Sequence, residues 1–271
     1  MTPAEHLAEV QAAFAPTDAR LGELVAAAVH HLHAFVEETG LTRDEWFAGI
    51  RFLTEVGHWC DDVRQEFILL SDTLGVSMLV EMLSTGTVPG ATEPTVFGPF
   101  HLDGAPERAL GASIVDAEVP GGEALVVRGA VRGVDGKPLG GARLDVWQVQ
   151  PNGLYDVQDA AGPAMNLRGI FTADREGRYE FRTVRPVDYT IPDDGPVGVM
   201  LRATGRKPWR PAHIHIVAEA EGYEPVTTHL FDAASPHLES DAVFGVRPSL
   251  VVAMDGGEAS FDITLAPSAS R

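Results

Sequence analysis

Residues 210–217 read Arg210-Pro211-Ala212-His213-Ile214-His215-Ile216-Val217, a run in which β-branched residues alternate with two histidines. Alternation of this kind predicts a β-strand, and side chains two positions apart on a strand lie on the same face. His213 and His215 are therefore close enough to bind one metal ion. Histidine pairs on strands also occur at surfaces and in packed cores, so the remaining ligands have to come from elsewhere in the chain.

Comparable short runs occupy most of the chain after residue 112, and turn-forming Gly, Pro, Asp and Asn separate them. The segments Asp135-Gly-Lys-Pro138 and Pro151-Asn-Gly153 are two such turns. Besides residues 210–218, the runs lie at 124–131, 142–149, 177–184, 227–230, 249–254 and 259–265. Short strands at this regular spacing are typical of a β-sandwich.

The first 88 residues have a different pattern, because they are rich in Ala, Leu and Glu and their apolar residues recur at helical spacing. Gly40 predicts the end of one helix, and Thr42-Arg-Asp-Glu45 has the form of a capping box that opens the next. We expect this next helix to bury Trp46, Phe47, Ile50, Leu53 and Val56. Glycines and prolines between residues 86 and 99 then predict a linker.

These patterns together predict an α+β protein. The expected boundaries are an all-helical N-terminal region at residues 1–90 and a β-sandwich domain at residues 91–271. A chain of 271 residues is long enough to bury a sizeable core in such an arrangement.

The chain is strongly acidic, with a formal net charge of −19. Residues 1–94 alone contain four Arg, no Lys and fifteen Asp or Glu. Nucleic acids and anionic membranes need a basic surface, so neither is an expected partner. No signal peptide or membrane-spanning apolar run is apparent, and we expect a cytoplasmic protein that is not embedded in a membrane. Cys60 is the only cysteine, which excludes an internal disulfide.

Few residues besides His213 and His215 are candidate metal ligands. The cluster His30, His31 and His33 lies within a predicted helix, where surface histidines are far commoner than metal ligands. Two of the four tyrosines, Tyr155 and Tyr189, follow or lie within turn-rich segments. Periodicity alone does not select these two over Tyr179 and Tyr223.

A resemblance to a known family resolves this choice. Nearly the whole chain resembles the intradiol ring-cleavage dioxygenases, the group of catechol and hydroxyquinol 1,2-dioxygenases. The matching segments are Phe97-Gly-Pro-Phe-His101, Leu144-Asp-Val-Trp-Gln148, Asn152-Gly-Leu-Tyr155, Asn166-Leu-Arg-Gly169, Gly177-Arg-Tyr179, Tyr189-Thr-Ile-Pro-Asp-Asp-Gly-Pro196 and Arg210-Pro-Ala-His-Ile-His215. The family's ligand order of Tyr, Tyr, His and His is met by Tyr155, Tyr189, His213 and His215.

The resemblance implies that these four residues hold Fe(3+). Anionic phenolate oxygens favour ferric over ferrous iron, whereas a zinc site would be expected to use His, Cys or carboxylate. The resemblance further implies that Tyr189 is displaced by the substrate and serves as a base. It also implies that Arg210 stabilises negative charge on the substrate ring. The implied reaction inserts both atoms of O2 into an aromatic diol.

Finer similarity favours the hydroxyquinol branch, whose product is 3-hydroxy-cis,cis-muconate or its tautomer maleylacetate. The segments Tyr155-Asp-Val-Gln158, Thr228-His-Leu-Phe231 and 239–250 resemble that branch, and catechol enzymes usually carry Gln where His229 stands. The expected substrate-binding residues are Leu69, Asp72, Val96, Phe97, Gly98, Pro99, Phe100, Ile191, Pro192, Arg210 and Val243. Asp72 would accept a hydrogen bond from the third ring hydroxyl, although an ordinary solvated aspartate at a helix end is an equal alternative.

Two other functions stay open at this point. A catechol or chlorocatechol 1,2-dioxygenase would share the chemistry and differ in the pocket. A non-catalytic β-sandwich binding module would need no such ligand set. The resemblance also implies a homodimer formed through the N-terminal helices, with phospholipid bound at the dimer interface.

Overall fold

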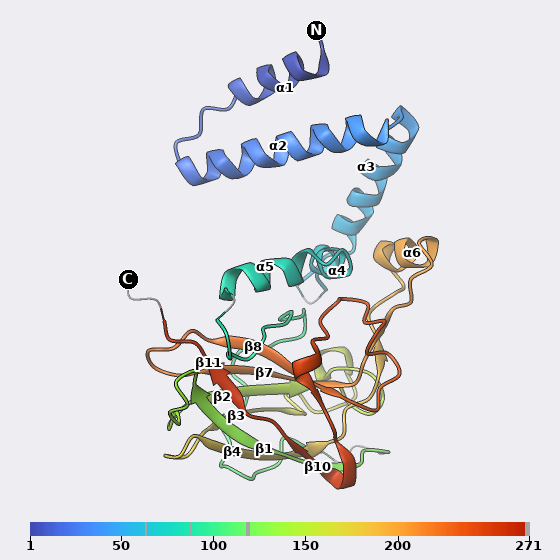
Figure 1. Ribbon diagram of the computed structural model, residues 1–271. Coiled ribbons are helices and arrows are strands. Elements are labelled where there is room, and N and C mark those ends of the chain that lie inside the picture. Colours follow the sequence, from blue (N-terminus) through green and yellow to red (C-terminus); the bar gives the residue numbers. More distant parts are fainter. Residues whose placement is uncertain (63, 87, 118–119, 269–271) are drawn as a thin grey trace. The chain divides into compact units, whose positions relative to one another are not determined.

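The computed structural model describes residues 1–62, 64–86, 88–117 and 120–268 (Figure 1). The chain divides into two compact units, Met1–Glu55 and Val56–Arg271. The fold class is α+β as predicted, with helices toward the N-terminus and sheets after residue 123. The expected domain boundary at residue 90 stays a prediction, since two helices before it belong to the same compact unit as the sheets.

The first unit contains the helices α1 (Pro3–Ala12) and α2 (Ala19–Thr39) and most of α3 (Arg43–His58). Gly40 ends α2 with a φ of 61°, a conformation that glycine adopts at little cost. The capping box at Thr42 and Glu45 is confirmed, because the Glu45 amide donates to Thr42 Oγ1 and the Thr42 amide donates to Glu45 Oε2.

The prediction that α3 buries its apolar face was wrong for four of the five residues within this single chain. Val56 is fully buried, but Trp46, Phe47, Ile50 and Leu53 are each between 46% and 49% exposed. Helical periodicity shows that a face is apolar, but it does not show what covers that face. Leu24, Leu32 and Phe35 on α2 are also more than half exposed. The first unit therefore leaves apolar side chains uncovered on two helices.

Among the described residues, the second unit contains two larger sheets and the two-stranded pair of β5 (Tyr189–Thr190) and β6 (Trp209–Arg210). Figure 1 shows the larger sheets. One sheet has the order β3 (Arg168–Thr172), β2 (Arg143–Gln148), β7 (His213–Glu219), β8 (Val226–Asp232) and β9 (Val251–Val252). In the other, β1 (Ala124–Gly133) pairs antiparallel with β4 (Arg178–Val184) on one side. On its other side it pairs in parallel with β10 (Glu258–Ser260) and then β11 (Ile263–Leu265).

A single buried cluster fills the space between the two sheets, as expected for a sandwich. Leu125 and Phe181 come from one sheet, and Leu144, Ile214 and Leu230 come from the other. All five side chains are almost fully excluded from solvent. Ile214 lies in this core, so His213 and His215, one position away on either side, project from the opposite face of β7.

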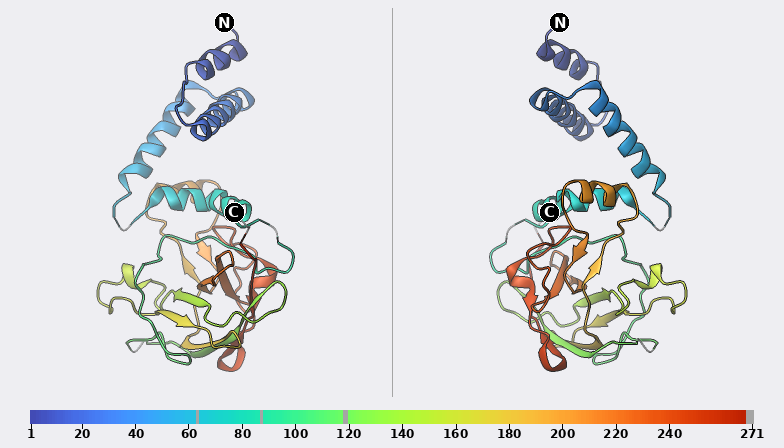
Figure 2. Two further views of the ribbon diagram at one scale, coloured as in Figure 1. Left: turned by 90° about the vertical axis from the view of Figure 1, so that its left-hand side faces the viewer. Right: turned by 90° about the vertical axis from the view of Figure 1, so that its right-hand side faces the viewer.

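Three helices of the second unit lie together on one side of the sandwich, as both views in Figure 2 show. They are α4 (Glu66–Thr73), α5 (Val76–Thr85) and α6 (Pro196–Ala203). The helix α6 was not predicted, since it lies outside the expected all-helical region at residues 1–90. No single helix among the described residues is long and apolar enough to cross a membrane; the bent pair Glu66–Thr73 and Val76–Ser84 meets that test only by length and composition.

The predicted strand at residues 210–218 is interrupted. Trp209 and Arg210 form a separate short strand, β6, which pairs with β5 (Tyr189–Thr190), and β7 begins only at His213. Pro211 has no amide hydrogen for a ladder bond, and the Ala212 amide donates instead to Asp188 Oδ1. This interruption brings Arg210 opposite Tyr189 in the β5–β6 pair.

Candidate metal centre

The structure brings the two tyrosines and two histidines together from three separate segments. Tyr155 Oη lies 3.0 Å from His215 Nε2 and 3.3 Å from Tyr189 Oη, and the Nε2 atoms of His213 and His215 are 3.1 Å apart. All four side chains are buried. Nitrogen and oxygen donors lie about 2.0–2.2 Å from a tetrahedral ion, which puts two donors of one ion about 3 Å apart. The four donor atoms therefore fit one metal ion.

Local structure explains how each donor reaches this point. Tyr155 follows β2 and the Asn152-Gly153 turn, where Gly153 has a φ of 83°, and it immediately precedes the short 3-10 helix Asp156–Gln158. Tyr189 opens β5, which the pairing with β6 holds beside Arg210. His213 and His215 project from one face of β7.

Burial and neighbouring groups determine the protonation of the donors before a metal binds. Burial lowers the pKa of His213 and of His215 well below the usual value, and nearby positive charge adds to this effect, so both rings are neutral. Burial, followed by the nearby Tyr189, raises the pKa of Tyr155 well above its usual value. A phenol in this position loses its proton only if a cation compensates the charge, and a bound metal ion is such a cation.

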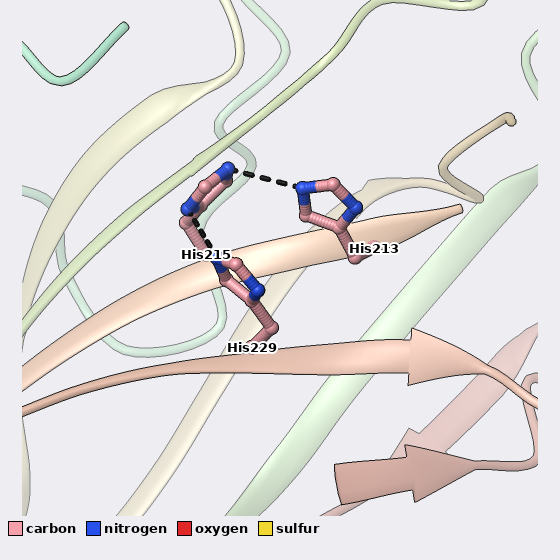
Figure 3. Close-up of side chains that lie close together, drawn as sticks. All are labelled: His213, His215 and His229. Atoms are coloured by element: carbon pink, nitrogen blue, oxygen red, sulfur yellow. Dashed lines mark hydrogen bonds between the residues drawn. The ribbon is translucent and has the colours of Figure 1, made fainter. Parts of the chain in front are cut away.

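His229 belongs to the same histidine cluster, but its Nε2 points to the His215 ring and not to the two tyrosines (Figure 3). Its Nε2 lies 2.7 Å from Nδ1 of His215, which is the ring nitrogen facing away from Tyr155 and His213. This hydrogen bond engages Nε2 of His229, and the other ring nitrogen, Nδ1, is buried without a hydrogen-bond partner among the described residues. Three histidines therefore lie together, but only His213 and His215 direct a nitrogen toward the two tyrosines.

Arg210 lies directly beside the four donors. Its Nη1 is 3.3 Å from Tyr189 Oη and 3.2 Å from His213 Nε2, and its Nε is 3.1 Å from Asp241 Oδ1. Burial disfavours a charged guanidinium, but the Asp241 carboxylate and, to a smaller extent, Tyr189 and Tyr155 together outweigh burial and raise the pKa of Arg210. Among the described residues, the buried Nη2 has no hydrogen-bond partner. The guanidinium is thus a fixed positive charge with one free donor group.

A cavity of about 690 Å³ opens beside Tyr189. Five of the expected substrate-binding residues line it, namely Leu69, Pro99, Phe100, Ile191 and Pro192. Phe100 also stacks on Tyr155, with ring centroids 4.7 Å apart. The volume is in the usual range for a small-molecule site, so a single aromatic ring can enter it and lie beside Tyr189.

The other expected substrate-binding residues do not line this cavity. Asp72, Val96 and Val243 are buried, and Phe97 is partly exposed beside Trp147. A Cβ on Gly98 would lie 3.4 Å from the His215 ring, so the backbone passes close to the donors there. Burial raises the pKa of Asp72, and the charge of Arg210 opposes this shift.

A polar network that residue spacing does not predict lies around Tyr155. Arg168 donates through Nε to Asp156 Oδ1 at 2.9 Å and through Nη2 to the Phe100 carbonyl at 2.7 Å. Asp156 is the residue after Tyr155, and both charged side chains are almost fully buried. Arg168 lies in the Asn166–Gly169 segment on which the family resemblance rested, but spacing alone gave it no role.

The family can now be stated from comparison with known proteins. Residues 96–267 match the family model described as dioxygenase, and residues 18–92 match the one described as catechol dioxygenase N terminus. The chain belongs to the intradiol ring-cleavage dioxygenases. This dioxygenase is therefore an oxidoreductase that incorporates oxygen, and membership implies a non-haem iron centre. The alternative of a non-catalytic binding module is thereby excluded.

Similar proteins include two curated enzymes that act on hydroxyquinols. The 6-chlorohydroxyquinol 1,2-dioxygenase of Cupriavidus pinatubonensis is 50% identical over 86% of this chain and 84% of its own length. The hydroxyquinol 1,2-dioxygenase of a Rhizobium species is 50% identical over 86% of this chain and 79% of its own. The solved structure of a Pseudomonas putida hydroxyquinol 1,2-dioxygenase superposes with a TM-score of 0.91 at 44% identity, covering 98% of this chain and 99% of that one.

Proposed function

We propose that the dioxygenase cleaves hydroxyquinol between its adjacent hydroxyl-bearing carbons, inserting both atoms of O2. The product would be 3-hydroxy-cis,cis-muconate or its tautomer maleylacetate. The observation that carries the proposal is the convergence of two phenols and two neutral imidazoles beside a cavity large enough for one aromatic ring. The names of the similar enzymes support hydroxyquinol as the substrate class.

Tyr155, Tyr189, His213 and His215 would hold the iron in its ferric state, because anionic oxygen donors favour Fe(3+) over Fe(2+). When bound, ferric iron would supply a Lewis acid that activates the aromatic ring of the bound diol toward O2. Tyr155, His213 and His215 would stay in place as fixed donors. Their burial excludes water from the donor cluster.

Tyr189 and Arg210 would carry out the proton and charge chemistry. The Tyr189 phenolate oxygen would accept a proton from a substrate hydroxyl, since Tyr189 lines the cavity and its Oη lies 3.3 Å from Arg210 Nη1 across the β5–β6 pair. Before this proton transfer, the Arg210 guanidinium would stabilise the Tyr189 phenolate that the substrate has displaced. Its free Nη2 would donate to negative charge that develops on the ring.

Asp72 is the proposed determinant of hydroxyquinol preference. Its carboxylate is buried one residue before the end of α4, within electrostatic reach of Arg210. Asp72 does not itself line the cavity, but Leu69, three residues earlier on the same helix, does. From this position the Asp72 carboxylate would accept a hydrogen bond from the third ring hydroxyl. Catechol lacks that hydroxyl and would leave Asp72 without this partner, which disfavours catechol binding.

Oxygen uptake measured side by side with hydroxyquinol, catechol and chlorocatechols tests the substrate. Hydroxyquinol should give the highest kcat/KM, and a higher value with catechol or a chlorocatechol would assign the enzyme to that alternative. Asp72→Ala should reduce the preference for hydroxyquinol over catechol. An unchanged ratio in a folded variant would remove Asp72 from this role.

The ligand set has a separate test in the visible spectrum. Ferric phenolate proteins absorb visible light through charge transfer from phenolate to iron, so the purified protein should be coloured. Tyr155→Phe should lose this band and most of the iron. A folded Tyr155→Phe variant that keeps full colour and iron would overturn the assignment of Tyr155.

We further propose that the enzyme is a cytoplasmic homodimer that dimerises through its N-terminal helices, with phospholipid at the interface. The uncovered apolar side chains of α2 and α3 support an interface of this kind. Sedimentation velocity should give twice the mass of the 29.0 kDa chain, and lipid extraction followed by mass spectrometry should detect the phospholipid. A monomer at micromolar concentration would contradict the proposed dimer.

A further inference from the structure

His215 lies in the middle of a row of three aromatic side chains that crosses three strands. The register of the sheet places Trp147 of β2 opposite His215 of β7, and His215 opposite His229 of β8. The Trp147 indole stacks on the His215 ring with centroids 4.5 Å apart and an interplanar angle of 12°. Stacking restricts the plane of the ring, but it does not determine which ring nitrogen carries the hydrogen.

The hydrogen bond to His229 determines which ring nitrogen of His215 carries the hydrogen. His229 Nε2 and His215 Nδ1 are 2.7 Å apart in a fully buried site, so one of these two nitrogens carries a hydrogen and the other accepts it. To bind a metal, Nε2 of His215 needs a free lone pair. The hydrogen of the neutral ring must then lie on Nδ1 and be donated to His229 (Figure 3).

His213 shows the same arrangement with a different acceptor. Its Nδ1 lies 2.7 Å from the Pro211 carbonyl oxygen, which can only accept a hydrogen bond. Backbone geometry thereby fixes the Nδ1–H form of His213 and directs its Nε2 lone pair to the centre. The orientation of His215 depends instead on a side chain, and a side chain can be replaced.

We propose that His229 is a positioning residue that holds His215 in its Nδ1–H form and directs the Nε2 lone pair toward the iron. This inference rests on the proposed role of His215 as a ligand. Hydrogen-bond partners of ligating histidines commonly change metal affinity by about 10- to 100-fold when they are removed. A side chain that accepts a hydrogen bond at the same place should replace His229, and an apolar side chain of similar size should not.

The tautomers can be observed directly in the iron-free wild-type protein by long-range 1H–15N correlation of the imidazole rings. Both His215 and His229 should carry their hydrogen on Nδ1. A His215 ring with its hydrogen on Nε2 would overturn the proposal, as would a His229 ring with its hydrogen on Nε2. This measurement needs no variant, so it decides the question even if a substitution at His229 prevents folding.

Variants then test the consequence for the metal. His229→Leu should weaken iron binding by about 10- to 100-fold and shift the visible band, whereas His229→Gln, whose Oε1 can accept from Nδ1, should stay within about threefold of wild type. Thr228→Val is the matched control, because Thr228 is buried on the same strand and donates instead to the Glu93 carbonyl. It should bind iron normally.

The outcomes separate this inference from the proposed ligand set. If His215→Ala keeps its iron, the ligand role of His215 fails, and this inference fails with it. If His215→Ala loses iron while folded His229→Leu binds it like wild type, the ligand set stands and the positioning role of His229 is wrong. Equal iron loss in His229→Gln and His229→Leu would also overturn the positioning role, since a hydrogen-bond acceptor at this place would then not preserve iron binding.

Discussion

Arg210 Nε lies 3.1 Å from Asp241 Oδ1, and both side chains are almost completely buried. The other Asp241 oxygen accepts from the Gly245 amide at 2.9 Å, so the carboxylate is itself held by the backbone. This pair fixes the direction of the guanidinium, with Nη1 toward Tyr189 and His213. Charge at the candidate site is thus oriented by a residue that touches none of the four donors.

Replacing Asp241 should therefore affect stability and activity together. Asp241→Ala leaves Arg210 buried without its counter-charge and should lower the free energy of unfolding by about 3–5 kcal/mol. Asp241→Asn should cost less, because its amide oxygen can still accept from Arg210 Nε. Urea unfolding measures the free energy of unfolding of both variants. The pair of Arg108 and Asp116, whose side chains are 14% and 40% exposed, gives the control, since Asp116→Ala should cost about 0–1 kcal/mol. Equal losses in Asp116→Ala and Asp241→Ala would contradict this account.

Asp72 should make the protein less stable at neutral pH than it would be with a neutral side chain. Burial raises its folded pKa above the unfolded value, so its contribution to stability is fully present below the unfolded pKa and is lost as pH rises through the folded one. Asp72→Asn should thus raise the free energy of unfolding at pH 7, by about 1.4 kcal/mol for each unit of pKa difference.

Denaturant unfolding of Asp72→Asn and wild type across a series of pH values checks this. The stability gained by Asp72→Asn should shrink as the pH falls toward the unfolded pKa of aspartate. Below that pKa Asp72 is protonated, so the wild-type and variant side chains are both neutral. An Asp72→Asn variant less stable than wild type at pH 7 would show that Arg210 and Ser77 outweigh burial.

Arg168 should be needed to hold Tyr155. Arg168→Met leaves Asp156 buried and unpaired beside Tyr155, and should lower the free energy of unfolding by about 3–5 kcal/mol. The iron content should fall as well, because Phe100, which stacks on Tyr155, loses the hydrogen bond to its carbonyl. The double variant Arg168→Met/Asp156→Asn removes the unpaired charge and should recover part of the stability. No recovery would mean that the charge of Asp156 is not the cause.

Glu66 should determine the shape of the cavity. This fully buried carboxylate accepts from the Val197 amide at 3.1 Å, near the start of α6, and from Arg64 Nε at 3.0 Å. Ile191 and Pro192, just before α6, line the cavity. Glu66→Ala should raise KM by about tenfold, equivalent to about 1.4 kcal/mol of binding, and change kcat less. Steady-state oxygen uptake measures this, with Glu66→Gln as the control that keeps the acceptor for Val197. A fall in kcat at constant KM would contradict a role in binding.

The sequence by itself determined those features whose causes are local. The capping box at Thr42 and the end of α2 at Gly40 follow from side-chain and backbone chemistry within a few residues. The alternation at residues 213–217 placed two histidines on one face of a strand. The family resemblance then named Tyr155 and Tyr189, which periodicity could not select. Local pattern and motif were sufficient to predict the fold class and to name the four side chains that the structure brings together.

The tertiary structure alone decided which distant residues meet. Asp241 reaches Arg210 across 31 positions, and His229 reaches His215 because two strands pair in one register among many. The strand break at Pro211 and the helix α6 also depend on partners far away in sequence. Register and packing minimise the free energy of the whole core, so no short stretch of sequence encodes them. The four clustered residues could be named from the chain, but the residues that contact and orient them are identified only in the folded structure.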